Sequence, residues 1–298
     1  MPTTLRAKGL RSFPLRTILG VFKLRIGVVI TLTALTGLAV SPGPSPSLAQ
    51  ILVLALSVLV SSASAGAFNQ YYESDRDRLM SRTRGRPFVT GEVRRGPLWL
   101  LAIVVLTVLA VAAAWLVLNP WSAFFVFFGA FFYAIVYTVW LKRRTWLNIV
   151  FGGLAGSWAV LAGATAADPQ PGAAPLALAL VLFLWTPPHF WSLALAYRDD
   201  YAAAGVPMLP VVVGEQRAAQ TIFGSTLALV AASLLPLATG LGVIYGIGAC
   251  AGGGLFIAKA WRLSREPTRG NALSCFHASL AQLSLVLLAA MVDSRVAS

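Results

Sequence analysis

Long apolar segments recur along nearly the whole chain, and short polar segments separate them. Each segment is long enough to cross the hydrocarbon core of a bilayer as a helix, which takes roughly 17–25 residues. Clusters of Pro, Gly and Ser break some of the runs, as at 41–47 and 168–172. We therefore predict an all-α, polytopic membrane protein with about nine transmembrane helices, near residues 19–40, 48–68, 97–117, 120–140, 146–166, 174–196, 218–238, 240–260 and 273–293.

Basic residues fall almost entirely on one side of this nine-span arrangement. Alternate loops, together with the N-terminal segment, hold 22 of the 23 Lys and Arg residues, and only Arg295 falls on the other side. Because basic loops stay cytoplasmic, the pattern predicts a cytoplasmic basic tail at 1–18 and a single transmembrane domain at 19–298. The basic, acid-free tail also resembles an organellar presequence, but we favour a plain cytoplasmic tail.

Composition supports a membrane protein and argues against other classes. The chain is 58% hydrophobic and 11% charged, whereas a soluble domain carries about 25% charged residues. The net charge of +13 does not indicate nucleic-acid binding, because such binding needs a basic face on a folded polar module. Cys250 and Cys275 have no metal-type spacing, so we interpret them as packing residues.

Acidic residues are scarce and concentrated. Seven of the ten lie in two segments on the predicted cytoplasmic side, after the second and the sixth spans. In the first segment, Asn69, Glu73 and Asp77 line one face if the helix continues past residue 68. Two carboxylates and an amide oxygen on one face suit Mg²⁺. Asp75 points elsewhere on that helix and is a candidate for a supporting role or a second metal.

Arginines follow the first acidic segment directly, with Arg82, Arg84 and Arg86 at alternate positions. Guanidinium groups beside carboxylates suggest a bridging polyanion, because Arg matches phosphate with paired hydrogen bonds. The alternative is that these arginines are topology signals and the acids are their surface partners. The helical phase of the acids at a membrane boundary argues against that alternative, since ionisable groups there are costly and usually functional.

Two further polar pairs lie at the same predicted membrane edge. Asp199 and Asp200 follow the sixth span, and Lys142 and Arg143 follow the fourth. Two acidic clusters at one depth can face each other across a cavity and hold a metal–diphosphate between them. For Lys142 and Arg143, a topology role is an equally open explanation.

The three segments, in this order, resemble the UbiA superfamily of intramembrane prenyltransferases, and more narrowly its protohaem IX farnesyltransferase family. In that family an Asn is followed by acids four, six and eight residues later, then by Met, Arg-Thr and Arg-Pro, as at 69–87 here. Segments 137–148 and 189–210 fit the same family. Three positions differ: Glu73 stands where Asp is usual, Arg198 where Lys is common, and span 9 has Phe276, Ser279 and Gln282 where Tyr residues are usual.

The resemblance implies nine helices around a central cavity that opens to lipid, with Mg²⁺ as cofactor and farnesyl diphosphate and haem b as substrates. The implied reaction transfers the farnesyl group to the 2-vinyl group of haem b, with addition of water, and gives haem o and diphosphate. The metal ligands and catalytic residues would be Asn69, Glu73, Asp77, Asp199 and Asp200, with Asp75 as a further candidate. The substrate-binding residues would be Arg82, Arg86, Lys142, Arg143, Tyr137, His189 and Tyr201.

His189 and His277 are the only histidines in the chain. For His277 we favour a hydrogen-bonded polar group inside the helix bundle. His189 follows two prolines within a span, where backbone groups are freed. We therefore weigh a contact with haem iron or propionate against the same structural role.

Two other functions stay open. An enzyme that prenylates a quinone precursor or a chlorophyll-type acceptor would share the acidic motifs, although Asp75 and the segment at His189 argue for haem. A transporter or channel would place charges at mid-membrane depth, whereas these cluster at one edge. We expect a bacterial inner-membrane protein with a cytoplasmic N-terminus, rather than a mitochondrial one. Docking by a haem A synthase or a terminal oxidase assembly factor is left open.

Overall fold

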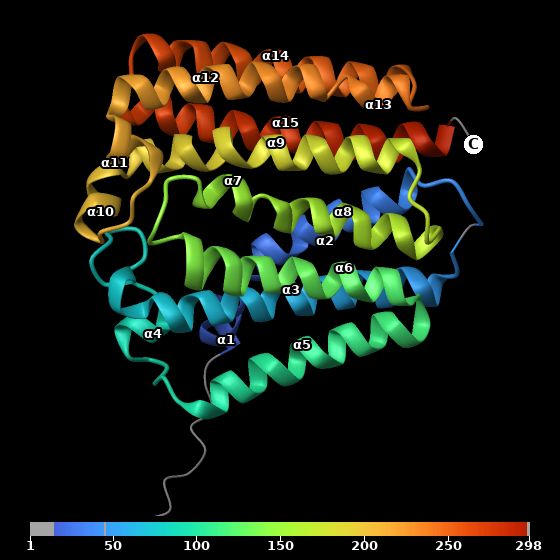
Figure 1. Ribbon diagram of the computed structural model, residues 1–298, viewed down its shortest axis with the longest axis horizontal. Helices are drawn as coiled ribbons and strands as arrows, with labels where there is room; N and C mark the ends of the chain where they lie inside the picture. Colours follow the sequence, from blue (N-terminus) through green and yellow to red (C-terminus); the bar gives the residue numbers. More distant parts are fainter. Residues whose placement is uncertain (1–14, 45, 297–298) are drawn as a thin grey trace, which may run out of the picture.

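The computed structural model describes residues 15–44 and 46–296, and these contain helices and connecting loops without a strand. Long helices run side by side in layers, from α5 and α3 at the bottom of Figure 1 to α12 and α14 at the top. The helices are α1 (Leu15–Phe22), α2 (Leu24–Ala39), α3 (Leu48–Asp77), α4 (Pro87–Thr90), α5 (Pro97–Val117), α6 (Pro120–Phe131), the π-helix η1 (Phe132–Leu141), α7 (Asn148–Gly152), α8 (Leu154–Ala167), α9 (Ala173–Ala196), α10 (Arg198–Ala203), α11 (Leu209–Val213), α12 (Glu215–Ala232), α13 (Leu235–Ala238), α14 (Val243–Arg265) and α15 (Arg269–Val296).

Eight helical segments of the described chain are long and apolar enough to cross a membrane, and α1 with α2 supplies a ninth if the bent pair is one span. The predicted all-α polytopic architecture is therefore confirmed. Each predicted span overlaps one of these segments. The largest difference is in the second span, which the apolar run predicts to end near residue 68 but which continues as helix to Asp77.

Helix α3 is long because its N-terminus is capped and no helix-breaking residue follows its apolar part. The side chain of Ser47 accepts a hydrogen bond from the Gln50 amide, and the Gln50 side chain accepts one from the Ser47 amide. This capping box satisfies two amides that the first turn leaves free. No Gly or Pro occurs between residues 67 and 84, so nothing ends the helix where the apolar run ends.

Glycines bring α2 and α8 into close contact. A Cβ atom on Gly37 would overlap the carbonyl of Val160, and one on Gly163 would overlap the carbonyl of Ala34. Small residues allow membrane helices to pack backbone to backbone, which strengthens van der Waals contact where lipid supplies no hydrophobic driving force. This contact joins the first two helices of the fold to its centre.

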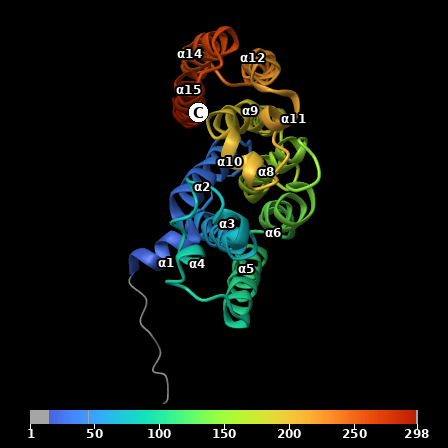
Figure 2. The same cartoon turned by 90° about the vertical axis from the view of Figure 1, so that its left-hand side faces the viewer.

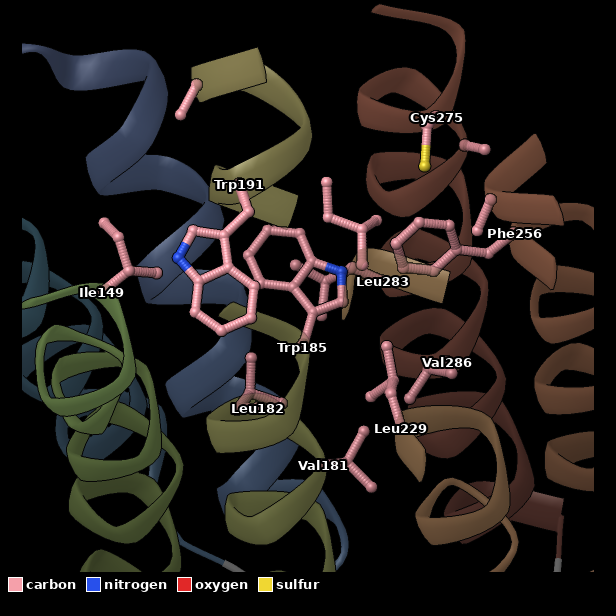
Figure 3. Close-up of a cluster of buried hydrophobic side chains, with 14 of the residues drawn as sticks. Ile149, Val181, Leu182, Trp185, Trp191, Leu229, Phe256, Cys275, Leu283 and Val286 are labelled. Carbon is pink, nitrogen blue, oxygen red and sulfur yellow. The ribbon is translucent and has the colours of Figure 1, made fainter. Parts of the chain in front are cut away.

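The most buried span is α9, which has neighbours on several sides. Trp191 points from α9 toward Ile149 of α7, whereas Trp185 points the other way, toward Leu283 of α15 (Figure 3). These indoles belong to one continuous apolar cluster that extends to Phe256 of α14. Because α9 anchors this cluster, side chains near its end are held by packing.

The first predicted span is not one straight helix. α1 ends at Phe22, α2 begins at Leu24, and the two axes differ by 51°. Lys23 lies at the bend with φ 48°, and it is the one residue other than glycine with positive φ in the described chain. Left-handed backbone costs a non-glycine residue about 1–2 kcal/mol, so surrounding contacts must hold the bend in place.

Contacts from α3 and from the loop after α4 secure α1. The side-chain amide of Gln70 donates to the carbonyls of Gly20 and Val21, and the Thr17 hydroxyl donates to Glu92. Residues 15–18 of the predicted tail are therefore helical and packed. The rest of that tail lies outside the described residues.

The predicted basic loops gather at one end of the bundle. The connections after α3 and α9 meet at the left of Figure 1, where α4, α10 and α11 lie, and Figure 2 shows this end face on. Ser81 of the first connection donates to Asp200 of the second at 2.6 Å. Arg269, where α15 begins, lies 5.4 Å from the ring of Tyr197. Segments far apart in sequence thus form one polar rim.

Candidate active site

One face of α3 carries three buried polar side chains near the rim. Asn69, Glu73 and Asp77 are 3%, 1% and 2% exposed. Their four-residue spacing on a continuous helix aligns them, as the sequence predicts, with about 6 Å of rise between neighbours. Burying two carboxylates is costly unless each is paired, so the partners of these groups define the site.

Glu73 is held by two cations from the end of η1. The Lys142 ammonium lies 2.6 Å from one carboxylate oxygen, and the Arg143 guanidinium lies 2.7 Å from the other. Arg143 also covers the ring of Tyr72 at 4.6 Å. Lys142 and Arg143, two of the cations predicted to bind substrate, therefore reach the first acidic motif. Their combined positive charge exceeds the single negative charge of Glu73.

Asp77 is paired with Arg86 across the tight connection that follows α3. The guanidinium lies 2.5 Å from the carboxylate. Between them, Met80 is buried, and the Thr83 hydroxyl donates to the Asp77 carbonyl at 2.9 Å. These contacts fold the connection back onto the helix end, which explains how a residue nine positions later reaches Asp77. Arg82 projects from the same connection toward the rim.

Lys23 lies inside the first predicted span, and it is a site residue that was not predicted from the sequence. Its ammonium donates to the Asn69 side-chain oxygen at 2.7 Å and lies 3.5 Å from the Tyr133 hydroxyl. The left-handed bend between α1 and α2 turns this side chain inward. The available signal was its position within the first predicted span, where a Lys is costly.

The π-helix η1 supplies the remaining wall. Thr138 accepts a hydrogen bond from the Asn69 amide and donates to the Tyr133 carbonyl, five residues earlier. Tyr133 and Tyr137 stack with ring centroids 5.6 Å apart. A π-helical turn is rare and often marks a functional site. Here it brings two tyrosines and Lys142 to the same side as Asn69.

The second acidic motif lies at the same end but farther out. The Asp199 side chain is 98% exposed and sits 3.7 Å from Arg198. Asp200 accepts the hydrogen bond from Ser81, and the buried Tyr201 hydroxyl lies 3.5 Å from Arg82. The two motifs are therefore joined through Ser81 and Arg82, while neither Asp199 nor Asp200 contacts Glu73 or Asp77.

A pocket of about 440 Å³ opens between these rim segments. Its lining includes Ser81, Asp200, Glu215 and Arg269. Tyr197 stands in this wall, and two guanidinium groups lie near its ring: Arg82 at 5.9 Å and Arg269 at 5.4 Å. The rim pocket is thus lined by groups of both signs.

Asp75 and His189 lie away from this cluster. The Asp75 side chain is 69% exposed and receives two hydrogen bonds from Arg95, at 2.8 and 2.9 Å. His189 is 6% exposed and lies inside α9, two turns before its end. Asp75 therefore points away from Asn69, Glu73 and Asp77, as expected from its phase on the helix.

The oxygen donors on α3 fit a magnesium ion by type. Asn69, Glu73 and Asp77 offer one amide and two carboxylate groups on one buried face. No group of three His, Cys, Asp or Glu in the described chain converges closely enough to hold a metal alone. Such an incomplete protein shell suits Mg²⁺, which usually keeps water and takes substrate phosphate oxygens as ligands.

Comparison with known proteins gives the class. The model of the UbiA prenyltransferase family matches residues 30–285, which is most of the chain. The chain belongs to the UbiA prenyltransferase family, and it is an intramembrane prenyltransferase.

Curated relatives narrow the class to the protohaem IX farnesyltransferases. Protoheme IX farnesyltransferase 2 of Paramagnetospirillum magneticum is 56% identical over 95% of this chain and 98% of its own length. Protoheme IX farnesyltransferase 1 of the same organism is 46% identical over 93% of this chain and 98% of its own length. The resemblance proposed from the motifs is therefore confirmed.

Solved structures agree on the fold. A structure described as digeranylgeranylglyceryl phosphate synthase superposes with a TM-score of 0.77 at 19% identity, covering 94% of this chain and 98% of its own. A UbiA homologue from Archaeoglobus fulgidus, bound to DMAPP and Mg²⁺, gives a TM-score of 0.68 at 17% identity, covering 91% of this chain and 99% of its own.

Proposed function

We propose that this enzyme transfers a farnesyl group from farnesyl diphosphate to the 2-vinyl group of haem b, with addition of water, to give haem o and diphosphate. The names of its curated relatives support the substrates. The structural observation that carries the proposal is the excess of positive charge around the buried face of α3.

That excess calls for a polyanion. Lys23, Lys142, Arg143 and Arg86 lie against a face with only two carboxylates, Glu73 and Asp77. Uncompensated positive charge in a desolvated site is unfavourable, and a bound diphosphate removes the imbalance. Guanidinium groups add bidentate hydrogen bonds to phosphate oxygens. A single carboxylate ligand would not balance the same set of cations.

Magnesium fits among Asn69, Glu73 and Asp77, where it would stabilise charge on the diphosphate as a Lewis acid. In the proposal, Asp199 and Asp200 are ligands from the second motif, reached through the rim pocket. Lys142, Arg143 and Arg86 hold the diphosphate oxygens, so that negative charge developing on the leaving group meets fixed positive charge.

Bond changes follow from this placement. The C1–O bond of the farnesyl diphosphate breaks, and its electron pair leaves with the diphosphate. The 2-vinyl group of the haem supplies the electron pair for a new C–C bond to C1, and the resulting cation takes up water and loses a proton. The stacked rings of Tyr133 and Tyr137 offer π faces that stabilise a neighbouring cation. Exclusion of water until the C–C bond has formed would limit hydrolysis of the allylic cation.

The proposed setting is a bacterial inner membrane with a cytoplasmic N-terminus. Support comes from the rim, where Arg82, Arg198 and Arg269 lie together with the acidic motifs and where basic residues mark the cytoplasmic side. Association with a haem A synthase or with terminal oxidase assembly is a proposal that follows from the product alone.

Product analysis tests the proposal. Purified protein with Mg²⁺ and farnesyl diphosphate is offered haem b or 4-hydroxybenzoate, and the extracts are analysed by mass. We expect haem o with wild type and a loss of at least about 100-fold with Asp77→Asn, because a metal-binding carboxylate disappears. Asp75→Asn is the matched control and should keep near-wild-type activity, since Asp75 is exposed and paired with Arg95. Prenylated 4-hydroxybenzoate without haem o would overturn the haem assignment.

A further inference from the structure

His189 makes a specific hydrogen bond through one edge of its ring. Its Nδ1 lies 2.6 Å from the Ser279 hydroxyl oxygen, which belongs to α15. The Ser279 hydroxyl itself donates to the Phe276 carbonyl at 2.6 Å. Both residues are buried, with 6% of His189 and none of Ser279 exposed.

This chain of hydrogen bonds favours one tautomer of the imidazole. A serine hydroxyl has one proton, and here the Phe276 carbonyl accepts it. With its proton on that carbonyl, Ser279 accepts from His189, and Nδ1 carries the hydrogen. A neutral imidazole has one N–H group, which leaves Nε2 of His189 with a free lone pair.

Aromatic rings hold the imidazole in place from both faces. Trp185 stacks on it with centroids 4.0 Å apart and planes 20° apart, and Phe276 stacks at 4.6 Å and 26°. Phe190 meets the ring edge-on at 4.9 Å. Trp185, which extends toward α15 in Figure 3, donates its indole N–H to the Ser279 carbonyl at 2.9 Å. Ser279 thus positions both the imidazole and the indole that covers it.

The other ring nitrogen is open. Nε2 of His189 has no hydrogen-bond partner within residues 15–44 and 46–296, and this atom is not completely buried. A neutral imidazole whose Nδ1–H is held by an oxygen while Nε2 is free is the form that binds metals.

We propose that Nε2 of His189 coordinates the iron of an iron porphyrin and that Ser279 is the positioning residue that fixes this tautomer. The ring donates its lone pair to an axial position of the iron, and no proton moves. This inference rests on the proposed function, because haem b is the iron porphyrin that it supplies. Coordination by His189 would select acceptors that carry a metal, and a quinone precursor carries none.

The position of His189 along α9 suits such a substrate. His189 precedes Tyr197 by eight residues, which is about 12 Å along a helix axis. Tyr197 belongs to the wall of the rim pocket, where Arg198 and Arg269 also lie. The propionates of a porphyrin lie on one edge of the ring system, so these arginines can face them while the iron faces His189.

Haem titration of the purified full chain, without farnesyl diphosphate and without a histidine tag, tests the proposal. Ferric haem b is added, and the Soret band and low-temperature electron paramagnetic resonance report the axial ligand. His189 and His277 are the only histidines, so His277→Ala is a direct control. We expect histidine-ligated haem in wild type and His277→Ala, its loss in His189→Ala, and partial recovery on adding free imidazole.

Ser279 is tested separately. Ser279→Ala should weaken haem binding about 10- to 100-fold, the usual effect of losing the partner of a metal-bound histidine, whereas Ser279→Thr keeps the hydroxyl and should restore binding. Ser284→Ala, on the exposed side of the same helix, is the control for general damage. Unchanged spectra and affinity in His189→Ala, or equal losses in Ser279→Ala and Ser284→Ala, would overturn the inference.

Turnover assays keep the two proposals distinguishable. Wild type that binds haem through His189 but forms no haem o would refute the proposed function and leave the ligand assignment intact. Conversely, haem o formation together with an unaltered spectrum in His189→Ala would refute the ligand assignment and leave the proposed function intact.

Discussion

Lys142 and Glu73, which are 69 positions apart in the chain, form a buried ion pair with 2.6 Å between ammonium and carboxylate. The Lys142 side chain is 10% exposed, while that of Arg143, the second cation on Glu73, is 28% exposed. The pair connects α3 with the end of η1. It therefore links the first acidic motif to the cations proposed to hold the diphosphate.

The two cations on Glu73 should differ in importance. We expect Lys142→Met to lower kcat/KM for farnesyl diphosphate by about 100-fold or more, because a buried cation stabilises developing charge strongly. Arg143→Met should cost about tenfold, since solvent screens a partly exposed group. Steady-state kinetics with varied farnesyl diphosphate measure both. Arg144→Met alters the exposed neighbour and should change little; a matching loss there would contradict the assignment.

Two substitutions of Lys23 should differ in stability but should weaken substrate binding alike. Lys23→Gly should be about 1 kcal/mol more stable than Lys23→Ala, because only glycine adopts positive φ without strain. Both variants remove the ammonium beside Asn69, so both should bind farnesyl diphosphate more weakly than wild type. Thermal unfolding in detergent, together with binding of a non-cleavable farnesyl diphosphate analogue, tests this. Equal midpoints for the two variants would count against the strained bend.

Asp293 is expected to affect stability without affecting the site. Its buried carboxylate accepts hydrogen bonds from the amides of Gly242, Ile244 and Tyr245, where α14 begins. Asp293→Ala should lower the free energy of unfolding by about 1–3 kcal/mol, the effect of leaving buried donors unsatisfied. Haem o formation per folded molecule should be unchanged, because α14 begins at the end remote from the rim. Asp168→Ala, which loses one loop contact with Gln170, should show a smaller shift in unfolding midpoint.

Close packing between α2 and α8 should not tolerate an added methyl group. Gly163→Ala is expected to destabilise the protein by about 1–3 kcal/mol through overpacking. Gly254→Ala, in an exposed and open part of α14, should instead stabilise it by about 0.5–1 kcal/mol, because alanine favours helix. Unfolding midpoints compare the two. A Gly163→Ala protein as stable as wild type would show that the helices can separate.

Much of the fold was predictable because bilayer thickness imposes a simple rule on the chain. Every predicted span overlaps a helical segment long enough to cross a membrane, the first of them as the bent pair α1 and α2. The spacing of Asn69, Glu73 and Asp77 correctly anticipated one face of a continued helix. The bend at Lys23 was not predictable, since nothing local requires a left-handed lysine. It depends on Gln70, which lies about 50 positions away and binds the end of α1.

Most residues of the candidate site could be predicted from the sequence, but the contacts between them could not. Arg86 follows the acids closely in sequence, and Lys142 and Arg143 were expected at the same membrane edge, whereas their specific partners depend on tertiary contacts. The π-helix was missed because its register shift arises over η1 as a whole, where Thr138 bonds to Tyr133. Sequence marked Ser279 only as a departure from the family pattern in span 9, and its contact with His189 gives it a role.

The long separation between Glu73 and its two cations also has a consequence for biogenesis. A ribosome releases α3 well before it makes Lys142 and Arg143, so the carboxylate enters the insertion machinery with neither counter-ion yet synthesised. An unpaired charge at a membrane boundary is costly. The end of α3 should therefore stay in contact with water or the translocon during synthesis, and it should settle into the bilayer only after the fourth crossing has emerged.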